Sequence, residues 1–386
     1  MERCRNRRSL SPLIGLMKVR ERGSIPVLAA LIVVVACGSG PSTVATTSIT
    51  PRPSLATVFD DRFGFLINRL SVNDPAIGLR VRLESDPQPV FDLGIGDAWP
   101  IVSPDGRRLA YWSENELRVI EMVRNASPRT LLTTSGRESA LYMAWSSDGT
   151  GLVVGVNGAQ AVPAVDGPPA YTAVRVVDVA AGQPREIIRI ANANVVPLAW
   201  DRKARLIAAY EPSSSGARSY YVVEEGGTAK RSDAGPGLYV VEASNDSQHV
   251  LGLGDPASVL RVWPATSYAA GIELRAVGGE PILAAGWRPG TAEIGVLFQD
   301  RLELWDASGG RRTLPLPQLQ SHPQALNVHA KLRFRVDGKA AFVIRLIDGM
   351  PDTDSVAVDL SSGKTVVVAG GGALLEPGIS VRVAST

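Results

Sequence analysis

Short apolar stretches separated by polar turns recur along the chain at nearly equal intervals. The stretch "AWSSDGTGLVV", residues 144–154, shows the unit: an apolar end, a Ser-Asp-Gly turn and a second apolar run. Equivalent turns are centred on positions 61, 105, 148, 203, 246, 290 and 337, at steps of 44, 43, 55, 43, 44 and 47 residues. A nearly fixed period of this size indicates an array of similar structural units.

Each repeat carries the chemistry of a tight turn between two strands. The turn position holds Asp in five repeats, Lys203 in the fourth and Gly290 in the sixth. An aspartate carboxylate accepts hydrogen bonds from nearby backbone, and a following glycine tolerates positive φ. The residue three places earlier is apolar or small in every repeat: Val58, Val102, Trp145, Trp200, Ala243, Trp287 and Phe334.

A second turn signature lies further along the repeats. An alternating strand ends in an acid, and a glycine follows at the fourth position, in the pairs Asp178 and Gly182, Asp306 and Gly310, and Asp359 and Gly363. Each unit therefore predicts four strands: strand, Asp-Gly turn, strand, loop, strand, acid-to-Gly turn, strand.

Four short strands at a period of about 43 residues are typical of a β-propeller blade. The "W-S-x-D-G" turn followed by an apolar strand resembles the WD-repeat-like class found in the propeller of TolB and of prolyl-oligopeptidase relatives, over residues 54–386. We therefore predict an all-β fold, a seven-bladed β-propeller, with seven blades fitting the spacing better than six or eight. A pair of β-sandwiches would not keep seven equal steps, and a β-helix needs a much shorter period.

The ends of a propeller must meet, because a loose seam exposes strand edges. The segment 374–385, "LLEPGISVRVAS", falls one period beyond Phe334, where another first strand is due. We expect it to join the innermost position of the first blade, and the segment 54–59 is the competing candidate.

The chain begins with features of an exported protein. A basic start precedes a 12-residue apolar run, residues 25–36, which is too short to span a bilayer comfortably and has the length of a signal-peptide core. Residues 34–37, "VVAC", resemble the lipobox of bacterial lipoproteins, which implies cleavage before Cys37 and acylation of that cysteine. The domains predicted are a lipoprotein signal peptide at 1–36, a flexible tether at 37–53 and the β-propeller at 54–386. The alternative is a buried free cysteine at the end of a transmembrane helix.

The resemblance implies a protein outside the cytoplasm of a bacterium, anchored to the cell membrane by lipid. Translation starts at either Met1 or Met17. Cys4 and Cys37 are the only cysteines in the sequence, so the body has no internal disulfide. The net charge of +2 includes the basic leader, and without it the body is slightly acidic. Such a body shows no electrostatic footprint for nucleic acid.

The sequence contains few motifs typical of catalytic or metal-binding sites. No G-x-S-x-G elbow occurs, and the three histidines, His249, His322 and His329, have no cysteine to complete a zinc site. We therefore expect no cofactor, no metal and no enzymatic activity. We expect instead a scaffold or protein-interaction module, in which loops of unequal length bind a protein or another component of the cell envelope. The candidate binding residues lie in these loops: Asp166, Tyr171, Tyr210, Arg218, Asp348, Asp352 and Asp354.

The alternative function is small-ligand or carbohydrate binding, or hydrolase or lyase activity, in an axial pocket. It requires acids, arginines or histidines that converge at the inner ends of several blades. A sensor or accessory domain of a membrane signalling system is a third possibility, suggested only by the location.

Overall fold

The computed structural model describes residues 64–71, 74–83, 89–95, 101–121, 126–159, 169–213, 216–233, 239–254, 257–306, 308–317, 328–335, 337–347, 354–369 and 374–381. All of them belong to one unit, Pro53–Thr386. The predicted signal peptide, Cys37, the tether and the segment 54–59 lie outside the described residues, so these assignments stay predictions.

The described secondary structure is almost entirely β. The first strands are β1 (Gly64–Ser71), β2 (Asp74–Leu83), β3 (Pro89–Ile95), β4 (Ile101–Val102), β5 (Arg108–Ser113), β6 (Glu116–Glu121), β7 (Arg129–Thr133), β8 (Glu138–Trp145), β9 (Gly151–Gly158), β10 (Tyr171–Asp178), β11 (Pro184–Ala191), β12 (Val196–Asp201), β13 (Leu206–Ser213), β14 (Gly216–Glu224) and β15 (Ala229–Asp233).

The remaining strands are β16 (Tyr239–Ala243), β17 (His249–Leu253), β18 (Val259–Pro264), β19 (Ile272–Arg275), β20 (Ala284–Trp287), β21 (Ile294–Leu297), β22 (Arg301–Trp305), β23 (Arg311–Pro315), β24 (Val328–Phe334), β25 (Ala340–Ile347), β26 (Asp354–Asp359), β27 (Thr365–Ala369) and β28 (Leu374–Val381). Two short 3-10 helices, η1 (Tyr268–Ala270) and η2 (Val277–Gly279), flank β19. The predicted all-β class is confirmed. Among the described residues, no helix has the length and apolar character needed to cross a membrane.

The described strands form seven four-stranded antiparallel sheets, and in six of them the strands follow chain order. In the sheet β8–β11, one end aligns Glu138, Gly158, Tyr171 and Ala191 across the strands. We call this the loop end, because the long β9–β10 connection leaves from it. The opposite end, here called the turn end, carries the tight β8–β9 and β10–β11 turns.

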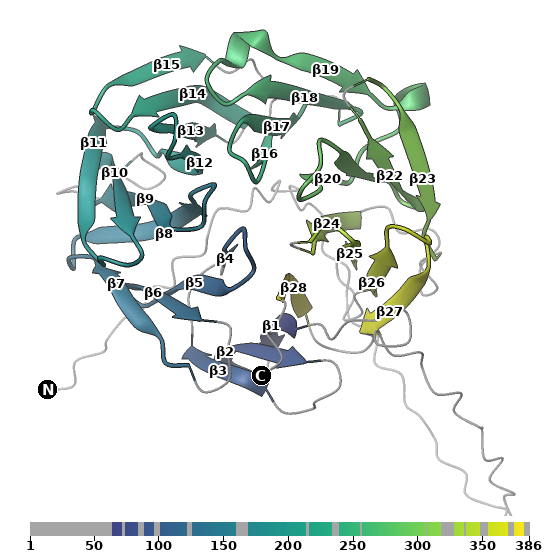
Figure 1. Ribbon diagram of the computed structural model, residues 1–386, viewed down its shortest axis with the longest axis horizontal. Coiled ribbons are helices and arrows are strands. Elements are labelled where there is room, and N and C mark those ends of the chain that lie inside the picture. Colours follow the sequence, from purple (N-terminus) through teal and green to yellow (C-terminus); the bar gives the residue numbers. More distant parts are fainter. Residues whose placement is uncertain are drawn as a thin grey trace, which may run out of the picture. The chain divides into compact units, whose positions relative to one another are not determined.

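The seventh sheet is completed by the last described strand. β28 pairs antiparallel with β1, in the order β28-β1-β2-β3. This confirms that the segment beginning at residue 374 takes the innermost position of the first sheet. The first strand of each sheet contacts that of the next, through β4, β8, β12, β16, β20, β24 and β28, and β28 contacts β4. The succession of sheets can be followed in Figure 1.

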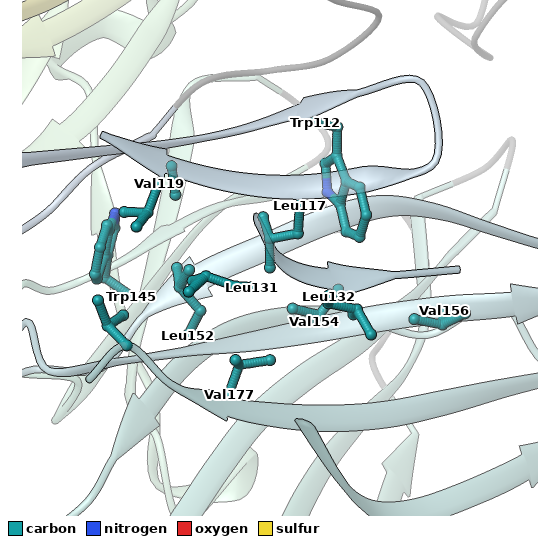
Figure 2. Close-up of a cluster of buried hydrophobic side chains, with 12 residues drawn as sticks. Trp112, Leu117, Val119, Leu131, Leu132, Trp145, Leu152, Val154, Val156 and Val177 are labelled. Carbon is teal, nitrogen blue, oxygen red and sulfur yellow. The ribbon is translucent and has the colours of Figure 1, made fainter. Parts of the chain in front are cut away.

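The core lies between neighbouring sheets. One buried cluster joins Trp112, Leu117 and Val119 of the sheet β4–β7 to Leu152 and Val154 of the sheet β8–β11. Figure 2 shows these side chains filling the space between the two layers. A single four-stranded sheet has two apolar faces, so it is stable only when a neighbour covers each of them.

Two aromatic residues near the ends of innermost strands pack against the second strand of the preceding sheet. A Cβ on Gly151 would lie 2.5 Å from the Trp200 ring, and a Cβ on Gly295 would lie 2.3 Å from the Phe334 ring. Glycine therefore makes room for the ring at both junctions. Trp145 belongs to the buried core, Phe334 is partly buried against it, and Val102 is partly buried.

The predicted turn chemistry is confirmed in the quoted stretch. The Ser146 hydroxyl donates to Asp148 Oδ1 at 2.6 Å, and Thr150 N donates to the same oxygen at 3.0 Å. Gly149 has a φ of 69°, which favours glycine. The pairs Ser103 with Asp105 and Ser244 with Asp246 repeat the bond between hydroxyl and carboxylate.

Candidate functional site

The sequence predicts the candidate residues in the loops of one end of the propeller, and the structure describes the side chains of two of them. Asp166, Asp348 and Asp352 lie outside the described residues. Arg218 lies in β14 and Asp354 at the start of β26, but their side chains are not described. The predicted partner surface at the loop end therefore stays a prediction.

Tyr171 belongs to a network of charged side chains at the loop end. Its hydroxyl donates to Glu138 Oε1 at 3.3 Å, and the Arg189 guanidinium lies 4.0 Å from its ring centre. Glu138 also forms an ion pair with Arg175 at 2.6 Å, and the two side chains are only 11% and 15% exposed. The hydrogen bond from Arg175 is the main reason that the pKa of Glu138 lies below its usual range. The charges of this network compensate each other.

Tyr210 lies in the next sheet, on β13. Burial raises its pKa to about 12, and the nearby Tyr142 phenol adds to the rise. Its hydroxyl is therefore neutral at physiological pH. No contact between Tyr171 and Tyr210 is found among the described residues, so the structure does not bring these two candidates together.

A pocket of about 730 Å³ lies at the turn end instead, between three consecutive sheets. Its volume is within the range of roughly 300–1,000 Å³ that is usual for ligand sites. We call it the arginine pocket. Its charged lining residues are Arg108, Arg129, Arg202 and Lys203, with Glu121, Asp148 and Asp178.

Two arginines reach the arginine pocket from the sheet β4–β7. Arg108 pairs with Glu121 at 2.8 Å and donates to the Gly149 carbonyl oxygen at 3.2 Å. Arg129 donates to the carbonyl oxygens of Val179 and Ala180, the second at 3.2 Å. Arg129 has no carboxylate partner among the described residues, and its five-donor guanidinium keeps N–H groups for a ligand.

Arg202 and Lys203 come from the opposite side, in the β12–β13 turn. Arg202 donates to the Thr150 hydroxyl and to Asp178 Oδ2, the latter at 3.4 Å, and its Nε lies 3.9 Å from Asp148 Oδ2. The exposed Lys203 side chain has no hydrogen-bond or ion-pair partner in the part of the chain that the structure describes.

The two central carboxylates are bound within their own turns. Backbone N–H groups of Ala181 and Ala180 donate to Asp178 at 3.0 and 2.9 Å, and this lowers its pKa. Burial would raise the pKa of Asp148, but hydrogen bonds from Ser146 and Thr150 outweigh it, so the pKa is lowered. Both carboxylates are therefore charged at neutral pH.

The arginine pocket thus combines four cations with three carboxylates, and Arg129 and Lys203 are the uncompensated cations. Planar guanidinium groups recognise carboxylates and phosphates through paired hydrogen bonds. The arrangement is suited to binding an anionic ligand. Sequence reasoning missed this pocket because it assigned function to the loop end. The available signal was the basic residues within the repeated turns, such as Arg108 and Arg202.

A second pairing lies on the inner strands. Glu242 of β16 accepts a hydrogen bond from Trp287 N of β20 and lies 3.8 Å from the Arg333 guanidinium of β24. A Cβ on Gly286 would lie 2.9 Å from Glu242 Oε1, so glycine leaves room for the carboxylate. Burial raises the pKa of Glu242, although its side chain is still 28% exposed. Three successive sheets thus bring together one acid and one arginine.

Among the residues that the structure describes, no three His, Cys, Asp or Glu side chains gather as a metal ion would require. His322 lies outside them, and the side chain of His329 is not described. His249 begins β17, with its ring centre 6.0 Å from that of Trp287.

No protein-family model matches the sequence, and no curated protein matches it. Solved structures do match. An oligogalacturonate lyase in complex with manganese has a TM-score of 0.54 at 13% identity, over 75% of this chain and 86% of that one. A protein from Bacteroides fragilis assigned as a 6-phosphogluconolactonase has a TM-score of 0.50 at 10% identity, over 86% and 97%. A prolyl endopeptidase has a TM-score of 0.51 at 16% identity, over 78% of this chain and 50% of that one.

These similar structures are β-propellers, and the likeness supports the β-propeller fold for this chain. The expectation that the chain is not an enzyme is wrong, because the similar structures are enzymes. That expectation depended on the lack of catalytic clusters in the sequence. Side chains from separate sheets of a propeller can meet, as Glu242 and Arg333 do, so a wide spacing of acids and bases in the sequence does not exclude an active site.

Proposed function

We propose that the chain is a seven-bladed β-propeller, held outside the cytoplasm by a lipid on Cys37, that binds an anionic ligand of the cell envelope in the arginine pocket. The blade number is supported by the seven described sheets and by the cycle of contacts between their first strands. The repeat spacing of the sequence supports the same number.

The lipid anchor is supported by the apolar run, the "VVAC" sequence and the Gly/Ser/Thr/Pro-rich segment after it. Each buried CH₂ of an acyl chain contributes roughly 0.8 kcal/mol to membrane binding, so more than one chain is needed for a firm hold. Replacing Cys37 by Ala is expected to move the protein from the membrane fraction to the soluble extracytoplasmic fraction. Retention of Cys37→Ala in the membrane would contradict the anchor.

The observation that carries the ligand proposal is the presence of two uncompensated cations, Arg129 and Lys203, in one concave site. A cleft lined by excess positive charge focuses the field and attracts anions. Because the pocket opens to solvent, we expect the attraction to weaken as salt screens the charges.

The test is a calorimetric titration of the purified full chain with inorganic phosphate at low ionic strength. We expect saturable binding that Arg129→Ala and Lys203→Ala each weaken, and that the double variant weakens about tenfold, a change of ~1.4 kcal/mol. Lys230→Ala is the matched control. Lys230 is exposed on β15 and does not line the arginine pocket, so this substitution removes one positive charge elsewhere on the surface. Equal binding by all variants, or no binding by the wild type, would contradict the proposal.

A further inference from the structure

The charges of the arginine pocket have an order. Arg129 comes from the sheet β4–β7, and Lys203 comes from the sheet β12–β15. The middle sheet, β8–β11, supplies Asp148 and Asp178 from its two turns. The uncompensated cations therefore flank a central pair of carboxylates, and the two cations belong to different sheets.

The central carboxylates remain acceptors. Asp148 uses Oδ1 for Ser146 and Thr150, while its Oδ2 has Arg202 Nε at 3.9 Å, beyond hydrogen-bond length. Asp178 uses Oδ1 for two backbone N–H groups and has a 3.4 Å bond from Arg202 at Oδ2. Each Oδ2 thus has capacity for a donor from a ligand.

The alternation of positive flanks and a negative centre restricts which ligands can bind in the arginine pocket. An anionic group over the middle of the pocket is repelled by Asp148 and Asp178, whereas a hydroxyl donates to them. An anionic group at either flank meets Arg129 or Lys203. A compound with charge along its whole length, such as a polyphosphate, has negative charge where the pocket is also negative.

We infer that the ligand is an acidic oligosaccharide whose anionic groups lie on different sugar residues, with neutral, hydroxyl-bearing sugar between them. This inference rests on the proposed anion-binding function. The hydroxyls donate to the carboxylates of the middle sheet, and the acidic groups bind the two flanking cations. Linking two weak contacts in one molecule raises the affinity above that of either alone.

The test compares four probes on the full chain by calorimetry. The main probe is a hyaluronan tetrasaccharide, in which glucuronate residues alternate with neutral N-acetylglucosamine. Glucuronate alone, the neutral tetrasaccharide chitotetraose and tripolyphosphate are the comparators. We expect the hyaluronan tetrasaccharide to bind at least about tenfold more tightly than glucuronate or chitotetraose. Arg129→Ala and Lys203→Ala should each remove most of that advantage, while Lys230→Ala keeps it.

Asp148→Asn separates hydroxyl recognition from simple attraction of charge. The amide keeps an oxygen for the turn but removes the negative charge. We expect Asp148→Asn to weaken binding of the hyaluronan tetrasaccharide severalfold and to strengthen binding of tripolyphosphate, provided its unchanged thermal midpoint shows that it folds. The variant Asp178→Asn provides the same test at the second carboxylate if the first does not fold.

The outcomes separate the two proposals. If glucuronate binds as tightly as the tetrasaccharide, the oligosaccharide inference is wrong and anion binding stands. If tripolyphosphate binds most tightly and Asp148→Asn strengthens binding of both the hyaluronan tetrasaccharide and tripolyphosphate, the inference is also wrong. If no probe and no phosphate binds, the proposed function itself has failed.

Discussion

The two ends of the sheets use charged side chains in different ways. Glu138 at the loop end and Arg175 in the middle of β10 bind each other in a largely buried pair, and Tyr171 and Glu186 complete the network. At the turn end, Asp148 and Asp178 accept hydrogen bonds from their own turns, and the arginines reach across to neighbouring sheets.

The difference explains why the arginine pocket is at the turn end. Carboxylates that shape turns are held close to the backbone and only partly neutralise the cations beside them. Arg129 binds carbonyl oxygens and Lys203 binds no described group, so positive charge remains available. The charged side chains at the loop end instead form ion pairs with each other. We therefore expect their substitution to affect stability more than binding.

The largest expected effect is at the loop end. Glu138→Gln removes the closest charged partner of the mostly buried Arg175, whose remaining carboxylate partner among the described residues is Glu186 at 3.4 Å. Breaking a buried pair is costly, so we expect the free energy of unfolding to fall by about 2–4 kcal/mol. Denaturant titration measures it. Glu186→Gln is the control, with a loss below about 1 kcal/mol because Glu186 is more exposed. Equal losses would show that burial does not set the cost.

The next effect concerns the packing beneath the arginine pocket. Gly151→Ala places a Cβ 2.5 Å from the Trp200 ring and 3.1 Å from the Val177 carbonyl oxygen. We expect a loss of about 1–3 kcal/mol in unfolding free energy, since the buried ring has little room to move. At Gly136 an added Cβ meets no atom within 4 Å, so Gly136→Ala should be nearly neutral. A harmless Gly151→Ala would mean that the two sheets adjust at this junction.

A smaller effect is expected from the charge of a turn carboxylate. The pKa of Asp178 is lowered by backbone N–H groups and by Arg202. Its stabilising contribution is therefore complete above the unfolded pKa, near 3.9, and is lost as pH falls through the folded pKa. Asp178→Asn lacks this contribution, so its unfolding free energy should fall less than that of the wild type between pH 5 and strongly acidic solution. Parallel curves for the two proteins would contradict the assignment.

The smallest effect is a slope of opposite sign. Burial raises the pKa of Glu242, which lies at the turn end but outside any turn. The wild type should lose stability as pH rises from the unfolded pKa of glutamate, near 4.3, through the raised folded pKa. Glu242→Gln should lack this loss and gain relative stability at neutral pH, as measured by thermal midpoints across that range. A gain at acidic pH instead would reverse the interpretation.

Much of the fold was predictable because its chemistry is local. The hydroxyl–carboxylate turn at Asp148, the positive φ of Gly149 and the acid-to-Gly turn at Asp178 and Gly182 are formed by residues within a few positions of one another. Their spacing predicts the four-stranded units, and the phase of the repeat predicts the place of the C-terminal strand. The count of cysteines likewise excluded a disulfide within the predicted propeller, because that count requires no knowledge of which residues are neighbours in space.

The candidate site depended on contacts between sheets. Arg108 and Arg129 are both basic residues near turns, yet one pairs with Glu121 and the other meets only carbonyl oxygens, which no local pattern distinguishes. Likewise, Glu242 and Arg333 meet only because the inner strands of successive sheets are adjacent. Whether a charge is compensated is decided by neighbours that are distant in sequence, and this is why the arginine pocket emerged only from the folded chain.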